Sequence, residues 1–251
     1  MTSILYCGDT SLDTAASYLV GMMSSWGWEF DYIPSTECVK PDQLTGRDLV
    51  ILSDYPADQM SDDAQATLLS SVRADTGLLM IGGWESFHGL GGNWDRTRIA
   101  EALPVVMRSD DDRINCDQSA VVRSVHHHPA IDGLPWRDRP PCIGGLNRFE
   151  TKPDATELLS ADRLKLTIDQ AGAIHLDVAE TLPLLVVGTY DKGHTAALAT
   201  DVAPHWVGGW VDWGEGRVEG KAPGAEPIEV GDLYAQFWKQ LLSYLRRKRA
   251  E

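Results

Sequence analysis

The chain has 251 residues, of which 43% are hydrophobic and 24% charged, and its formal net charge is −15. This balance is typical of a globular protein that buries a sizeable core without needing disulfides or a structural metal. The acidity argues against nucleic acid and anionic membranes as partners, because binding either requires a basic face. The basic cluster from Arg246 to Arg249 is interpreted as the end of a helix.

The sequence also predicts where the protein works. No apolar run approaches the roughly 18–20 residues of a membrane-spanning helix, and the first residues lack the pattern of a signal peptide. The cysteines are scattered without a CxxC pair, so we expect reduced thiols rather than a disulfide framework or a zinc site. We therefore expect a cytoplasmic protein with one domain spanning residues 1–251 and no cofactor.

Strand and helix patterns alternate in the first ninety residues. Apolar runs predict strands at 4–7, 28–33, 48–53 and 78–81, with helical spacing at 12–23 and 61–72. The second helix should begin at Ser61, a good capping residue. Such alternation implies a parallel sheet with right-handed crossovers, whose ligand crevice lies beyond the carboxyl ends of the strands. We expect four loops to meet there: 8–10, 34–36, 53–55 and 82–94.

The second half has a different pattern. Strands are expected at 119–125, 173–178, 184–190 and 195–200, with a hairpin turn at 191–194. Residues 214–231 are rich in Gly, Glu and Pro and are predicted to form an exposed loop. A last helix is expected at about 232–247, because apolar residues recur there at helical spacing.

A glycine-rich run, residues 82–93, follows the fourth predicted strand. Its Gly89-Leu90-Gly91 is a poor match to a dinucleotide loop, because that loop belongs after the first strand and a third glycine is missing. Two interpretations remain open. The run is a tightly turning structural loop, or it is a site loop that presents Glu85, Ser86, His88 and Asn93. Ser86 would then be a candidate nucleophile, against a hydroxyl that caps the next helix.

The segment from Thr200 to Trp206 is the second candidate. A strand ends near Asp201, and His205 and Trp206 are expected to project at the same edge of the sheet. His205, oriented by Asp201, is either a general base or a buried structural imidazole. Several Trp residues are expected to converge here, as a sugar-binding platform or as a dimer interface; they are Trp84, Trp94, Trp206, Trp210 and Trp213.

The triplet His126-His127-His128 is the one histidine cluster. On a strand, His126 and His128 would point to the same side and could hold a metal with a nearby carboxylate. The His128-Pro129 pair also fits an ordinary turn. We favour the turn and predict no metal site.

An ordered set of motifs then resembles a known family. The set consists of Ile81-Gly-Gly-Trp-Glu-Ser-Phe-His-Gly-Leu-Gly-Gly-Asn-Trp-Asp-Arg-Thr97, Leu103-Pro-Val105, Asp111-Asp-Arg113, His128-Pro-Ala-Ile-Asp-Gly-Leu134, Pro183-Leu-Leu-Val-Val-Gly188, Thr200-Asp-Val-Ala-Pro-His-Trp206 and Phe237-Trp238. Together they resemble the family of putative glutamine amidotransferase-like cytoplasmic proteins, related to trehalose-utilisation-type proteins. The resemblance covers nearly the whole chain. It implies a class I glutamine amidotransferase-like fold, a flavodoxin-like three-layer α/β/α arrangement with β-rich additions in the second half.

The activity implied by the family name does not fit these residues. The family's nucleophile is a cysteine on a sharp turn after a strand, and here that position corresponds to Trp84. The family's later His is matched by His205, but Val207 stands where a Glu would orient it. An indole cannot form a thioester, so the sequence predicts no cysteine-dependent glutaminase activity.

The sequence therefore supports two hypotheses. In the first, the protein acts on or binds a small polar metabolite, for example a carbohydrate derivative, at the carboxyl ends of the strands. His205, Glu85 and Ser86 are then the catalytic candidates, and Trp84, His88, Asn93, Asp201 and Trp206 the ligand-binding candidates. In the second, the same fold is a non-catalytic metabolite-binding or assembly protein. Either way, we expect a homo-oligomer.

Overall fold

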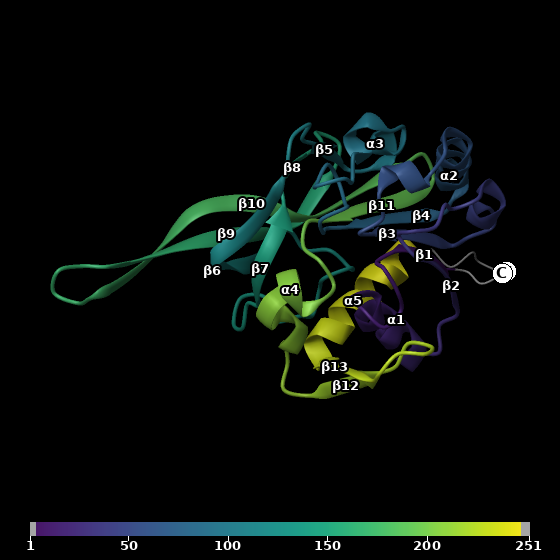
Figure 1. Ribbon diagram of the computed structural model, residues 1–251. Coiled ribbons are helices and arrows are strands. Elements are labelled where there is room, and N and C mark those ends of the chain that lie inside the picture. Colours follow the sequence, from purple (N-terminus) through teal and green to yellow (C-terminus); the bar gives the residue numbers. More distant parts are fainter. Residues whose placement is uncertain (1–3, 247–251) are drawn as a thin grey trace.

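The computed structural model describes residues 4–246, and its first half is a parallel α/β unit (Figure 1). Its strands and helices fall close to the predicted places: β1 (Ile4–Gly8), α1 (Ala16–Ser25), β2 (Phe30–Ile33), β3 (Leu49–Ser53), α2 (Asp62–Ala74) and β4 (Gly77–Ile81). Ser61 caps α2 as expected, since its hydroxyl accepts a hydrogen bond from the Ala64 N–H at 3.3 Å. The predicted basic cluster falls largely at 247–249, outside the described residues.

The second half adds long antiparallel strands to this unit. They are β5 (Val105–Met107), β6 (Arg113–Ser124), β7 (Cys142–Asn147), β8 (Phe149–Thr151), β9 (Thr156–Ile168), β10 (Ile174–Tyr190) and β11 (Gly193–Leu198). The hairpin turn predicted at 191–194 is confirmed but shorter, because β10 and β11 pair up to Tyr190 and Gly193 and leave residues 191–192 as the turn. The two strands expected at 173–178 and 184–190 are one continuous 17-residue strand. Pro183 did not break it, and a bulge lies next to the proline.

The remaining elements are short except for the last helix. They are η1 (Pro41–Leu44), η2 (Ala57–Gln59), η3 (Trp94–Arg96), α3 (Ile99–Ala102), α4 (Pro204–Val207), η4 (Gly208–Asp212), β12 (Arg217–Gly220), β13 (Ile228–Gly231) and α5 (Asp232–Leu245). The prediction of an exposed loop at 214–231 is wrong in part, since β12 and β13 form a small hairpin there. This hairpin packs on α1, where a Cβ on Gly220 would lie 2.5 Å from the backbone of Gly21.

Nine of the described strands build one mixed sheet in the order β2-β1-β3-β4-β11-β10-β9-β6-β7, and β5 with β8 and β12 with β13 form two separate two-stranded sheets. The parallel part, β2-β1-β3-β4-β11, has the strand order of a flavodoxin-like sheet, so the predicted fold class is confirmed. The crossover through α1 runs in the opposite direction to the one through α2. Right-handed crossovers therefore place these helices on opposite faces, with α5 on the same side as α1 (Figure 1).

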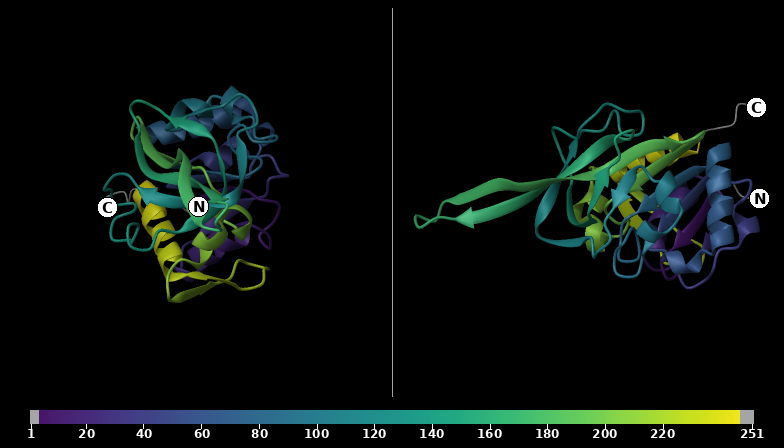
Figure 2. Two further views of the ribbon diagram at one scale, coloured as in Figure 1. Left: turned by 90° about the vertical axis from the view of Figure 1, so that its left-hand side faces the viewer. Right: turned by 90° about the horizontal axis from the view of Figure 1, so that it is seen from above.

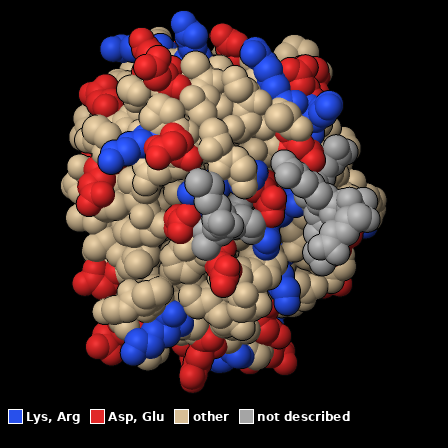
Figure 3. Space-filling model, turned by 90° about the vertical axis from the view of Figure 1, so that its right-hand side faces the viewer, with Lys and Arg blue, Asp and Glu red and all other residues tan. Residues whose placement is uncertain are grey.

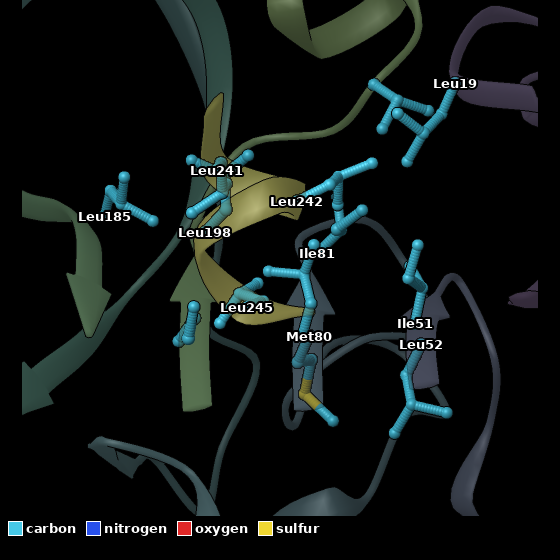
Figure 4. Packing of buried hydrophobic residues seen from close by; sticks show 14 of the residues in the cluster. Leu19, Ile51, Leu52, Met80, Ile81, Leu185, Leu198, Leu241, Leu242 and Leu245 are labelled. Carbon is cyan, nitrogen blue, oxygen red and sulfur yellow. The ribbon is translucent and has the colours of Figure 1, made fainter. Parts of the chain in front are cut away.

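The core fills the two spaces between the sheet and its helices. Strand residues such as Ile51, Ile81 and Leu198 and helix residues such as Leu241 and Leu245 are fully buried together (Figure 4). The parallel strands are apolar on both sides, as expected for strands covered by helices on both faces. No helix within residues 4–246 is long and apolar enough to cross a membrane.

One feature lies outside this compact body. The distal ends of β9 and β10 form a two-stranded arm, residues 164–178, that extends far beyond the sheet (Figures 1 and 2). Residues 165–178 are all exposed.

Candidate active site

The ends of the parallel strands open into a pocket of about 450 Å³. It lies at the β1–β3 boundary, where the direction of the crossovers changes, which is the usual ligand site of such sheets. All four predicted loops contribute to its lining, which consists of Asp9, Thr10, Thr14, Ala15, Ser35, Asp54, Trp84, Glu85 and Leu90. We call it the carboxylate pocket, because Asp9, Asp54 and Glu85 supply its charged groups.

Asp9 is held rigidly just after β1. Its backbone is in the left-handed region, with φ of 53°, and its N–H donates to the Ser53 carbonyl at 2.9 Å. The Tyr6 hydroxyl donates to Asp9 Oδ2 at 2.5 Å. Burial and then the charge of Asp201 raise the pKa of the Asp9 carboxyl well above its usual range. The preceding Gly8 is required, because a Cβ there would lie 1.6 Å from the Ser53 carbonyl oxygen.

Asp54 occupies the equivalent position after β3 and is also left-handed, with φ of 45°. Its Oδ1 accepts a hydrogen bond from the Glu85 N–H at 2.7 Å, and its own N–H donates to Ser86 Oγ at 3.0 Å. Burial and the charge of Asp201 raise the pKa of Asp54 to about 7. Gly83 passes directly over this carboxyl, and a Cβ at Gly83 would lie 2.1 Å from Asp54 Oδ1.

Asp201 follows the end of β11 at Leu198 by three residues, and its charge acts on both of the other carboxyls. It is 7% exposed, and its Oδ1 accepts a hydrogen bond from the Val202 N–H. Burial raises the pKa of Asp201, and its charge in turn raises those of Asp9 and Asp54. Three carboxyls thus titrate against one another, an arrangement more common at functional sites than elsewhere.

Glu85 and Trp84 form the opposite wall. Burial raises the pKa of the Glu85 carboxyl. The Trp84 side chain is 45% exposed, and the Arg113 guanidinium lies 4.5 Å from its ring centre. The guanidinium covers one face of the indole, and both Trp84 and the exposed Leu90 line the pocket.

The loop from Gly82 to Trp94 is held by buried polar groups from elsewhere in the chain. Asn147 Oδ1 accepts from the Gly83 N–H at 2.9 Å, and its Nδ2 donates to the Gly83 carbonyl and to Asp112 Oδ1. The Asp112 carboxylate in turn accepts from the backbone N–H groups of His88 and Gly89. The loop shape is therefore built by tertiary contacts rather than by a following helix.

Three of the predicted site residues, Ser86, His88 and Asn93, hold this loop instead of lining the pocket. Ser86 is 2% exposed and its hydroxyl accepts from Asp54, so the expectation that it caps a helix is wrong. His88 Nδ1 lies 2.8 Å from Asp95 Oδ1, and Asn93 is a left-handed residue whose Nδ2 donates to Gly91. Of the eight predicted site residues, Trp84 and Glu85 line the pocket, and Asp201 acts on its carboxyls through its charge.

His205 and Trp206 are placed elsewhere, on α4. His205 is exposed and is not part of the pocket lining. Trp206 is 1% exposed; its Nε1 donates to Asn115 Oδ1 at 2.8 Å, and its ring packs directly on Gly145. Trp210 and Trp213 are equally buried, within the chain's own core. Trp94 is buried as well, so of the five Trp residues expected to converge as a sugar platform or a dimer interface Trp84 alone is exposed.

The histidine triplet does not lie on a strand, because β6 ends at Ser124. His126 Nδ1 lies 2.8 Å from the Glu157 carbonyl, and the His128 ring packs edge-on against Tyr244. Within residues 4–246, no group of three His, Cys, Asp or Glu side chains is arranged to hold a metal ion.

The sequence contains a signal for Asp9 and Asp54, two pocket residues that were not predicted as site residues. Asp9 and Asp54 each come directly after the last residue of a strand that was predicted correctly. The carboxyl ends of neighbouring parallel strands meet at one edge, so this repeated position places the two side chains together. Asp201 was predicted for this edge, but its effect on the pKa of Asp9 and Asp54 could not be predicted, since its loop follows the antiparallel insertion.

The fold and the pocket are those of a flavodoxin-like α/β protein with a candidate ligand site at the carboxyl ends of its parallel strands. Comparison with known families identifies the family. The family model described as "Putative glutamine amidotransferase" matches residues 7–218, and the chain belongs to that family. None of the curated proteins compared with the chain matches it.

Three solved structures illustrate how far the fold is shared. Cytoplasmic protein STM3548 from Salmonella typhimurium has 23% identity and a TM-score of 0.73, covering 99% of this chain and 100% of that one. Cytoplasmic protein STM1381 from Salmonella typhimurium LT2 has the same identity and TM-score, with 96% and 98% covered. A β-galactosidase from Rahnella sp. R3 has 13% identity and a TM-score of 0.57, and matches 99% of this chain but 32% of its own. At these identities the likeness is one of fold.

Proposed function

We propose that this protein binds a small polyhydroxylated metabolite, such as a carbohydrate derivative, in the carboxylate pocket, and that it does so without cysteine chemistry. The observation that carries the proposal is the convergence of Asp9, Asp54 and Glu85 around one pocket, each with a raised pKa. A carboxyl that is partly protonated near neutral pH can both donate and accept hydrogen bonds, which suits hydroxyl groups.

The pocket walls support the same class of ligand. Hydroxyls of Thr10, Thr14 and Ser35 add polar partners, and Trp84 adds an apolar face against which a sugar ring can stack. The volume of about 450 Å³ suits a single small metabolite. Because the charged groups are acidic and the net charge is −15, neutral or cationic ligands should be favoured over anionic ones.

Acid–base catalysis is the chemistry that these groups could supply to a bound ligand. Asp54, with a pKa of about 7, can donate or accept a proton near neutral pH. Glu85 lies beside it and donates its N–H to the same carboxyl. We assign the proposed acid–base role to Asp54 and Glu85, and give none to the exposed His205.

The absence of cysteine chemistry is supported by the positions of the thiols. None of Cys7, Cys38, Cys116 and Cys142 lines the pocket. Burial raises the pKa of the Cys7 thiol, which lies within β1, so little thiolate forms there. The residue beyond Gly82 and Gly83, where the family resemblance places the nucleophile, is Trp84. A cytoplasmic location is part of the same proposal, supported by the four free thiols.

Thermal shift measurements with three related sugars test the proposal. We expect glucose and glucosamine to raise the melting temperature and glucuronate, at the same concentration, to raise it less, because its carboxylate is repelled by the pocket. The Trp84→Ala variant should lose most of the shift, whereas Glu219→Gln, an exposed carboxyl on β12, should keep it. A shift by glucuronate alone, or one unaffected by Trp84→Ala, would contradict the proposal.

A further inference from the structure

The arm formed by residues 164–178 has two unlike faces. Directly opposed residues on antiparallel strands share a face, and the register pairs Leu164 with Val178, Leu166 with Leu176 and Ile168 with Ile174. One face is therefore a continuous strip of six apolar side chains, which we call the apolar strip. The other face carries the pairs Lys165–Asp177 and Thr167–His175.

The strip is exposed to a degree that a globular protein rarely tolerates. Nine large hydrophobic side chains are exposed among the described residues, and five of them belong to the strip: Leu166, Ile168, Ile174, Leu176 and Val178, at 41–67% exposure. Together they present on the order of 500 Å² of surface, a size at which an apolar patch is often functional.

Polar residues border the apolar strip at both ends. At the tip, Asp169 Oδ1 accepts from the N–H groups of Ala171 and Ala173, which orders the turn. At the base, Asp162 accepts from Thr181 Oγ1 at 2.7 Å and from Arg123 Nε at 3.1 Å. An apolar centre with a polar border is the usual anatomy of a protein interface.

The arm also needs a contacting surface for its own stability. An isolated two-stranded hairpin is at best marginally stable in water. Residues 165–178 are exposed, although near the base of the arm the Leu166 N–H donates to Gln118 Oε1 of β6. Ordering of the arm is therefore expected to depend on a surface that buries the strip.

The charge of the arm indicates which kind of surface can cover the apolar strip. Residues 164–178 carry one Lys against two Asp, so this segment contributes −1 of a net charge of −15. Acidic and basic residues are instead interspersed over the opposite end of the molecule (Figure 3). The acidic bodies of two copies repel each other, whereas their nearly neutral arms can approach. The strip also lacks the charge that a basic or acidic partner would recognise.

We infer that the apolar strip packs against the same strip of a second copy of this chain, forming a two-fold dimer. Such an interface is isologous, so one flat apolar ribbon is complementary to itself. Two facing strips remove on the order of 1,000 Å² from water, which is the lower bound for a specific interface. This inference does not depend on the ligand of the carboxylate pocket.

Matched double variants in sedimentation velocity test the dimer. Wild type should sediment at twice the chain mass at 10 µM, and raising NaCl to 1 M should not dissociate it. Leu166→Asp with Leu176→Asp adds two carboxylates to one opposed pair of the strip and should weaken association at least 100-fold. Thr167→Asp with His175→Asp adds two carboxylates to the neighbouring pair on the polar face and should remain dimeric. Circular dichroism confirms that each variant is folded.

Several results would overturn the inference. One is wild-type protein that is monomeric at 100 µM, and another is association of the strip variant as tight as that of wild type. Equal dissociation of both double variants would also contradict it, because the effect would then not belong to the apolar face. A trimer or larger ring would exclude the two-fold pairing.

Discussion

At the scale of single residues, the unusual feature is a pair of aspartates in left-handed backbone conformations at neighbouring strand ends. Asp9 and Asp54 are both fixed by backbone hydrogen bonds before any ligand arrives. Groups held in this way need little reorganisation on binding. The glycines beside them, Gly8 and Gly83, are required by contact distance, because a Cβ at either would overlap a neighbouring oxygen.

The raised pKa of Asp54 predicts a pH-dependent stability. An unfolded Asp titrates near 3.9, whereas folded Asp54 titrates at about 7. The folded chain therefore holds this proton more tightly, and the stability that it contributes is complete below about pH 4 and lost as the pH rises to about 7. Asp54→Asn should raise the free energy of unfolding at pH 8 by about 1–3 kcal/mol, and by much less at pH 4.

Urea unfolding at both pH values measures this difference. Asp58→Asn is the matched control, since it removes one carboxylate from an exposed position close by in the chain. A gain at pH 8 no larger for Asp54→Asn than for Asp58→Asn would show that the Asp54 carboxyl is not destabilised by its surroundings.

At the scale of elements, the loop of residues 82–94 is shaped by Asn147, which comes from β7 on the far edge of the sheet order. Asn147→Ala should leave the Gly83 N–H and carbonyl and the Asp112 carboxylate without this partner. We expect a loss of about 2–4 kcal/mol in the free energy of unfolding, because each unsatisfied buried group costs about 1–3 kcal/mol.

Hydrogen exchange locates the effect of Asn147→Ala. Amides of residues 82–94 should exchange faster, while those of α2 should be unchanged. Gln170→Ala, at the exposed arm tip, is the control and should change stability by less than about 0.5 kcal/mol. Unchanged exchange in the loop would mean that Asn147 does not hold it.

The same elements show what the sequence could and could not predict. The parallel strands and α5 could be predicted, because the spacing of apolar residues within each segment marks them. The positions of the strand ends could be predicted from the same spacing. The arm could not be predicted as such, because its alternating pattern is that of any half-buried strand. The places of Ser86 and His205 depend on tertiary contacts, and no local pattern marks them as outside the pocket.

At the scale of the whole molecule, the protein has an acidic α/β body with a pocket at one edge of its sheet and a nearly neutral arm projecting from it. These features lie on different elements, so ligand binding and dimer formation can be changed independently. The family to which the chain belongs is described as putative glutamine amidotransferases, and we propose that this chain works without cysteine chemistry. In this chain the same edge presents carboxyls.

The most direct test of that central claim is ammonia release from glutamine by wild type and by the four variants Cys7→Ser, Cys38→Ser, Cys116→Ser and Cys142→Ser. The account predicts release no faster than the uncatalysed rate for every protein. Turnover by wild type that disappears in any one cysteine variant would contradict it.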